Sequence, residues 1–105
     1  MAGRVTTADG WLAARTRGAP EELRARVDAW VQTAPANPAG AALLATAGAA
    51  ALGAAIGLPG DRSVALDLLA ADALVTLALL HQAEHDASGL EALARDIRLT
   101  GNLPA

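Results

Sequence analysis

Apolar residues recur along this chain at intervals of three and four positions, which is the spacing of one face of an α-helix. The clearest run lies at positions i, i+4, i+7 and i+8 and consists of Leu23, Val27, Trp30 and Val31. A similar run near the C-terminus consists of Leu90, Leu93, Ala94 and Ile97. No strand pattern is evident, so the sequence predicts an all-α fold.

Proline and glycine interrupt this pattern and divide it into five predicted helices. The predicted helices cover residues 8–17, 20–33, 39–58, 62–86 and 89–100. Pro20 stands at a helix start, where its missing N–H is not needed. Asp61 or Ser63 can cap the fourth helix, and Ser88 with Glu91 has the spacing of a capping box before the fifth.

The length of the chain, 105 residues, suits one domain. The fourth predicted helix has two apolar stripes, one of which consists of Leu66, Leu69, Ala73, Leu77 and Leu80. The other consists of Leu68, Val75 and Leu79. A helix with two apolar faces is buried centrally or shared with a partner. We therefore expect a compact four- to five-helix bundle, residues 1–105, with the third and fourth helices as a central antiparallel hairpin.

The third predicted helix is unusual because residues 29–60 contain no charge and segment 39–58 is rich in alanine and glycine. Ala49, Gly53 and Gly57 form a ridge of small residues, and such a ridge lets another helix backbone approach closely. Together with the second stripe of the fourth helix, it gives the predicted interface, whose members are Ala49, Gly53, Gly57, Leu68, Val75 and Leu79.

Segment 39–58 also has the length of a membrane span. Its ten alanines and four glycines make it only weakly hydrophobic, without the density of leucine, isoleucine and valine that drives insertion. No aromatic residues flank it closely. A small membrane-anchored subunit is therefore a less favoured interpretation than a protein that stays in the cytoplasm.

Composition narrows the possible functions. Cysteine is absent, which excludes disulfides, thiolate catalysis and cysteine metal sites. Residues 1–12 lack the apolar segment of a signal peptide, so we expect a cytoplasmic protein. The net charge is −3 and the arginines form no basic stripe, which argues against nucleic acid as a partner. Every basic residue is arginine, and alanine is abundant, which indicates a GC-rich and, we expect, bacterial coding sequence.

The end of the fourth predicted helix contains the one pattern with a chemical precedent. His81, Glu84 and His85 match H-x-x-E-H, a pattern of zinc proteases. Histidines at i and i+4 face the same way and can chelate a metal ion. A protease also needs a third ligand and a cleft, and only 20 residues follow His85. We favour the interpretation that His81, Glu84 and His85 are ordinary polar residues in the last turn of a long helix. Binding of a metal ion or another ligand by these residues is the alternative.

Two acids interrupt the apolar fourth helix, Asp67 and Asp72. At i and i+5 they do not share a face, so they are not a ready carboxylate pair. Asp72 can meet Arg24, Arg26 or Arg62 across the bundle, and we favour such a structural role for the two acids, with a functional site as the alternative.

The sequence contains no motif for a reaction and no motif for a cofactor. The favoured interpretation is a small non-enzymatic interaction or accessory protein that forms a homo-oligomer or packs against a partner protein. A metal- or ligand-binding protein is the first alternative, and a membrane-anchored subunit is the second.

Overall fold

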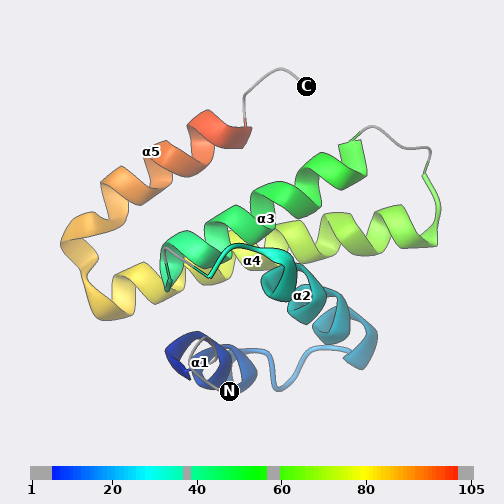
Figure 1. The fold of residues 1–105 in the computed structure, drawn as a ribbon, viewed down its shortest axis with the longest axis horizontal. Coiled ribbons are helices and arrows are strands. Elements are labelled where there is room, and N and C mark those ends of the chain that lie inside the picture. Colours follow the sequence, from blue (N-terminus) through cyan, green and yellow to red (C-terminus); the bar gives the residue numbers. More distant parts are fainter. Residues whose placement is uncertain (1–5, 37–38, 57–59, 102–105) are drawn as a thin grey trace.

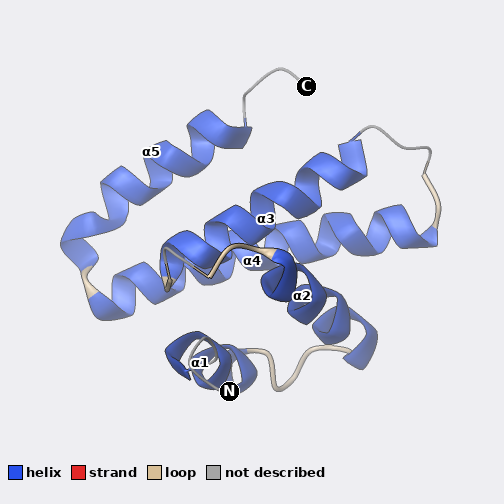
Figure 2. Ribbon diagram, in the orientation of Figure 1, coloured by secondary structure: helices blue, strands red, loops and turns tan. Residues whose placement is uncertain are grey.

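The computed structural model describes residues 6–36, 39–56 and 60–101. Within them the chain forms helices and loops only (Figure 2), so the predicted all-α fold is confirmed. The elements, in chain order, are α1 (Thr6–Arg15), α2 (Glu21–Thr33), α3 (Ala41–Ile56), α4 (Arg62–His85), the short 3-10 helix η2 (Ala87–Gly89) and α5 (Leu90–Gly101).

An antiparallel hairpin of α3 and α4 forms the centre of the molecule, as expected (Figure 1). Helix α2 packs against both members of the hairpin from one side. Helix α5 also contacts both of them, but it diverges from them towards its C-terminal end (Figure 1). Helix α1 lies below the hairpin in this view, beside α2, and contacts the C-terminal part of α4 through Trp11 and Arg15 (Figure 1).

Small residues form the seam between α3 and α4. Ala47, Ala51, Ala70 and Ala78 are completely buried there. At Gly48 the two helices are so close that a Cβ atom would lie 3.2 Å from the Cβ of Leu74 and 3.3 Å from a Cγ of Val75. The low volume of these residues therefore permits close helix packing, which compensates for the small area that each alanine buries.

The alanine seam corrects the predicted leucine stripe of α4 in part, since Leu77 is buried in the core and Ala73 packs against it, as expected. The helix faces α3 through Ala70, Leu74 and Ala78, whereas Leu69 and Leu80 are 55% and 38% exposed. Because α3 approaches the alanine face so closely, the larger leucines on either side of that face remain at the edges of the interface.

The ends of the helices follow the predictions in part. Asp61 caps α4 by accepting a hydrogen bond from the Val64 N–H at 2.9 Å, which selects it over Ser63. The predicted capping box at Ser88 is wrong. Asp86 accepts hydrogen bonds from the Ser88 N–H at 3.2 Å and the Ser88 hydroxyl at 2.6 Å, so this segment forms η2 and α5 begins only at Leu90.

Helix α1 differs from the prediction at both ends. It begins at Thr6 rather than at residue 8, and it ends at Arg15 because residues 16–18 form a turn. The turn is held by a bond from the Thr16 hydroxyl to the Leu12 carbonyl at 2.9 Å. The last two residues of the predicted third helix, 57 and 58, lie outside the described residues.

Candidate functional site: a groove between α3, α4 and α5

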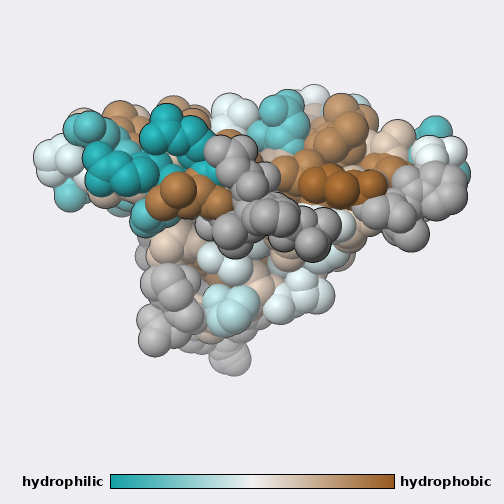
Figure 3. All heavy atoms as spheres, turned by 90° about the horizontal axis from the view of Figure 1, so that it is seen from above, coloured by the Kyte–Doolittle hydropathy of each residue, from teal (hydrophilic) through white to brown (hydrophobic). Residues whose placement is uncertain are grey.

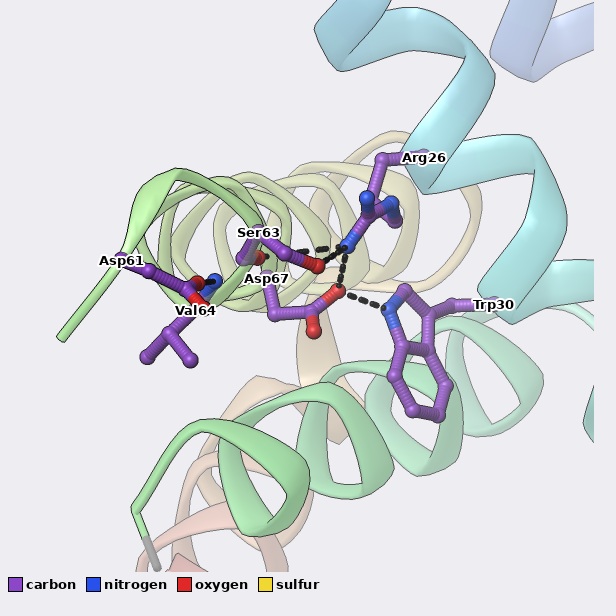
Figure 4. A network of polar contacts seen from close by, with 6 residues as sticks. All are labelled: Arg26, Trp30, Asp61, Ser63, Val64 and Asp67. Carbon is purple, nitrogen blue, oxygen red and sulfur yellow. Dashed lines mark hydrogen bonds and ion pairs between the residues drawn. The ribbon is translucent and has the colours of Figure 1, made fainter. Parts of the chain in front are cut away.

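Two clusters of the same composition attach α1 and α2 to α4. The first surrounds Asp67 (Figure 4), which accepts hydrogen bonds from the Arg26 guanidinium at 2.5 Å and the Trp30 indole N–H at 2.9 Å. Arg26 also donates to the Ser63 carbonyl at 3.3 Å. Burial raises the pKa of Asp67, but the bonds from Trp30 and Arg26 outweigh it and hold the pKa below its usual value.

This cluster corrects the expected pairing of Asp72. Arg26 pairs with Asp67 and not with Asp72, because Asp72 lies about 140° around the helix from Asp67 and away from α2. Glu22, which has i,i+4 spacing to Arg26, pairs instead with Arg62 at the start of α4.

The second cluster surrounds Glu84, near the other end of α4. Its carboxylate accepts hydrogen bonds from the Trp11 indole N–H at 2.8 Å and from Arg15 at 2.6 Å. The bond from Trp11, and then that from Arg15, lower the pKa of Glu84. In both clusters an arginine and a tryptophan four residues apart hold one carboxylate of α4. This four-residue spacing of arginine and tryptophan in α1 and α2 can be read from the sequence and is the signal for these contacts.

His81 and His85 do lie on one face of α4, as their spacing predicts. Their rings stack with centroids 4.0 Å apart, and the His85 Nδ1 atom lies 2.8 Å from the His81 carbonyl oxygen. The edge of Trp11 meets the His81 ring at 4.9 Å. Buried His81 has no hydrogen-bond partner at Nε2 among the described residues, and burial, followed by the His85 charge, lowers its pKa.

These contacts bear on the predicted metal ligands His81, Glu84 and His85. Glu84 is held by α1, and the two imidazoles stack on each other rather than converging on a common point. Among the described residues no group of three histidine or acidic side chains is arranged to hold a metal ion. Metal binding stays a prediction, and loss of co-purified metal in His81→Ala would be its test.

A groove of about 650 Å³ lies between α3, α4 and α5. Its floor comes from α3 and its walls come from α4 and α5. The residues that line it are Ala42, Ala45, Thr46, Gly48, Ala49, Leu52, Leu68, Ala71, Asp72, Val75, Leu93, Asp96 and Ile97. Most of these are apolar, and the groove opens to solvent where α5 diverges from the hairpin.

Each wall of the groove carries one carboxylate among apolar side chains. On α4, Asp72 lies one turn from Leu68 and from Val75. On α5, Asp96 lies between Leu93 and Ile97. Neither carboxylate makes an ion pair or hydrogen bond with any other described residue. The sequence did not single out Asp96, because an acid on an amphipathic helix is ordinarily a solvent-exposed group.

The groove brings together half of the predicted interface. Ala49, Leu68 and Val75 line it, whereas Leu79 packs against the core. Gly53 is exposed on α3, with no atom within 4 Å of the place a Cβ would occupy. Gly57, the third member of the predicted ridge, lies outside the described residues. The close approach inside the chain is at Gly48, which the ridge did not include.

Large apolar side chains near the groove are exposed. Leu68 is 52% exposed and Ile56 is 62% exposed. Figure 3 shows hydrophobic side chains gathered on the right of one face, where Figure 1 places the end of α3 and the start of α4. Exposed apolar patches are found at protein-protein and membrane contact sites and at ligand-binding grooves.

One described helix, α4, has the length and apolar composition to cross a membrane, although core helices of soluble proteins pass the same test. Only 22% of its most apolar window is buried within the chain. Helix α3, the span considered from the sequence, has 16 described residues and a length of about 24 Å, less than the ~30 Å of a bilayer core. Helix α4 therefore has apolar surface that the described chain does not bury.

No family model, curated protein or solved structure matches this chain. The fold and the groove are therefore the basis for a functional proposal.

Proposed function

We propose that this chain is a small non-enzymatic interaction protein whose groove receives a helix of another polypeptide. The observation that supports the proposal is the groove itself, which remains apolar and open beside a hairpin whose other side is covered by α2. An amphipathic helix laid into such a groove buries apolar surface on both partners, a recurrent mode of peptide recognition.

The floor of the groove fits a helix better than a compact ligand. Its α3 positions Ala42, Ala45, Ala49 and Leu52 follow one another at i, i+3, i+7 and i+10. They extend over the eleven residues from 42 to 52, or about 15 Å of helix. Because most of them are small, a second backbone can come close to α3 there, as α4 does at Gly48 on the adjoining face.

A matched pair of substitutions on α3 tests this proposal. Ala49→Trp places a large side chain in the groove, whereas Ala50→Trp places the same side chain at the neighbouring exposed position outside it. We expect both variants to fold, with α-helical circular dichroism like that of the wild type. Photo-crosslinking in the source cells, from a diazirine analogue of leucine incorporated into the chain, is followed by mass spectrometry. It should join the groove of the wild type and of Ala50→Trp to another polypeptide or a second copy, because Leu52 and Leu68 line the groove.

The proposal requires that Ala49→Trp lose this crosslink. Light scattering coupled to size exclusion, run on the same three proteins, shows whether the bound polypeptide is a second copy. If the crosslinks of Ala49→Trp equal those of the wild type, the groove is not the contact surface and the proposal is overturned.

A further inference from the structure

The carboxylates of Asp72 and Asp96, which are unpaired among the described residues, indicate what kind of helix binds in the groove. This step rests on the proposed function, since it assumes that a helix lies in the groove. We infer that this helix belongs to a different protein and carries an arginine in the middle of its apolar stripe, where the side chain reaches both Asp72 and Asp96.

Charge is the reason for the arginine. A purely apolar helix laid across the groove would remove water from Asp72 and Asp96 without replacing its hydrogen bonds, and uncompensated burial of a charge is costly. A cation between the two walls removes that cost. Arginine suits the position better than lysine, because its planar guanidinium has five donors and can serve two carboxylates at once.

The position of the cation follows from the walls. Asp72 has Leu68 and Val75 about one turn away on either side, and Asp96 lies between Leu93 and Ile97. The α4 wall therefore has the order apolar, acidic, apolar, whereas on the α5 wall Leu93 lies about one turn before Asp96 and Ile97 directly follows it. The complementary helix has apolar residues one turn before and one turn after its arginine, so that they pack on the apolar parts of the walls.

Charge also argues against a second copy as the occupant. In a twofold dimer the same patch lies on both sides of the contact. The carboxylates of one groove would then face those of the other, in a chain whose net charge is already −3. Like charges brought together in this way oppose association, whereas a basic partner is attracted to the groove from a distance.

The test uses two labelled synthetic helical peptides of 19 residues as probes, a length fixed by the design. Both have the same stripe of leucine and alanine, and they differ at its central position, which is arginine in one peptide and glutamate in the other. Fluorescence anisotropy measures the binding of each peptide to the wild type, to Ala49→Trp, to Ala50→Trp and to the double variant Asp72→Asn with Asp96→Asn.

We expect the arginine peptide to bind the wild type at least about tenfold more tightly than the glutamate peptide, a preference equal to about 1.4 kcal/mol. The preference should disappear in the double variant, because the asparagines keep the shape of the walls and remove their charge. Binding of the arginine peptide should survive in Ala50→Trp and be lost in Ala49→Trp.

The other outcomes separate the inference from the proposed function. If both peptides bind equally well and Ala49→Trp blocks both, the groove binds helices but the arginine inference is overturned. If the purified chain forms a dimer that Ala49→Trp abolishes, the groove binds a second copy and the basic partner is overturned. If neither peptide binds the wild type, or Ala49→Trp changes nothing, both proposals are overturned.

Discussion

Asp67 and Asp72 are five residues apart in the same apolar helix, yet their surroundings are opposite. Asp67 faces α2, where Arg26 and Trp30 bind its carboxylate and its side chain is only 12% exposed. Asp72 faces the groove, where no described residue pairs with it and it remains exposed. The same residue type is therefore structural on the covered side of α4 and available for recognition on the open side.

The difference depends on which helix covers each side of the hairpin. Helix α2 contacts both α3 and α4 and presents an arginine and a tryptophan to Asp67. Helix α5 also contacts both but diverges from them, so it shapes one wall of the groove without filling it (Figure 1). Because Arg95 on α5 pairs with Glu91 of its own helix, it does not neutralise Asp72.

The sharpest test of this comparison replaces each aspartate in turn by alanine. Asp67→Ala leaves the guanidinium of Arg26 and the indole N–H of Trp30 without their partner, so we expect the free energy of unfolding to fall by about 3 kcal/mol. Asp72→Ala removes no contact within the described chain and should change it by less than about 0.5 kcal/mol. Urea unfolding followed by circular dichroism measures both. Equal losses would contradict the assignment of Asp67 as the structural acid.

The two glycines of α3 provide the second test. A leucine at position 48 would press against Leu74 and Val75, and we expect Gly48→Leu to destabilise the chain by about 2 kcal/mol, as overpacked cores do. Gly53→Leu introduces the same side chain into the same helix where nothing lies within 4 Å. It should stabilise the fold by up to about 1 kcal/mol, because leucine favours helix over glycine.

The same glycine pair also tests the predicted ridge. If Gly53→Leu unfolds the chain, position 53 is in contact within the fold and the open face described for it is wrong. If it folds normally but loses a partner or a second copy, the ridge at Gly53 extends the interaction surface beyond the groove. Thermal unfolding and light scattering on one sample distinguish these outcomes.

A third prediction concerns acid and the covered end of α4. Burial lowers the pKa of His81 below its usual value of 6.5, so the unfolded chain binds a proton more readily at this site than the folded chain. The stability contributed by neutral His81 is therefore present above pH 6.5 and decreases as the pH falls below it. The groups facing this imidazole are His85 and Glu84 on α4 and Trp11 on α1.

Unfolding free energies measured from pH 8 to pH 5, a range fixed by the design, check this expectation. The wild type should lose stability towards the acid end, and His81→Phe, which keeps an aromatic ring at the site, should lose less over the same range. Asp67 and Glu84, whose pKa values are lowered from ordinary values of 3.8 and 4.5, contribute stability that is lost as the pH falls below 4.5, so they do not account for a slope between pH 8 and pH 5. An identical slope in the variant would contradict the role of His81.

The smallest expected effect concerns the attachment of α1. Glu84→Gln keeps a hydrogen-bond acceptor for Trp11 but removes the charge that pairs with Arg15. Since this pair is partly exposed, global stability should hardly change, whereas amide hydrogen exchange in Thr6–Arg15 should become faster. Glu91→Gln, which breaks the exposed pair with Arg95 on α5, is the matched control and should leave the exchange of α1 unchanged.

Local sequence determined much of this protein. Periodicity, proline and glycine indicated the five helices to within a few residues, since turn residues and helical spacing act over short distances. The uncharged third helix and the two-faced fourth helix also indicated the central hairpin, because only mutual packing can bury two such apolar segments. The i,i+4 spacing of histidines, too, correctly placed His81 and His85 on one face.

Long-range geometry determined the rest. The sequence offered an arginine pair to Asp72 and a ridge at Gly53 for the close approach of another backbone, whereas the structure pairs Asp67 with Arg26 and brings α4 close to α3 at Gly48. In each case the two candidates lie on the same helix and are chemically identical, so nothing local distinguishes them. The choice depends on how far α3, α2 and α5 are rotated and tilted against α4. The same rotation and tilt, and no residue pattern by itself, leave the groove open beside α5.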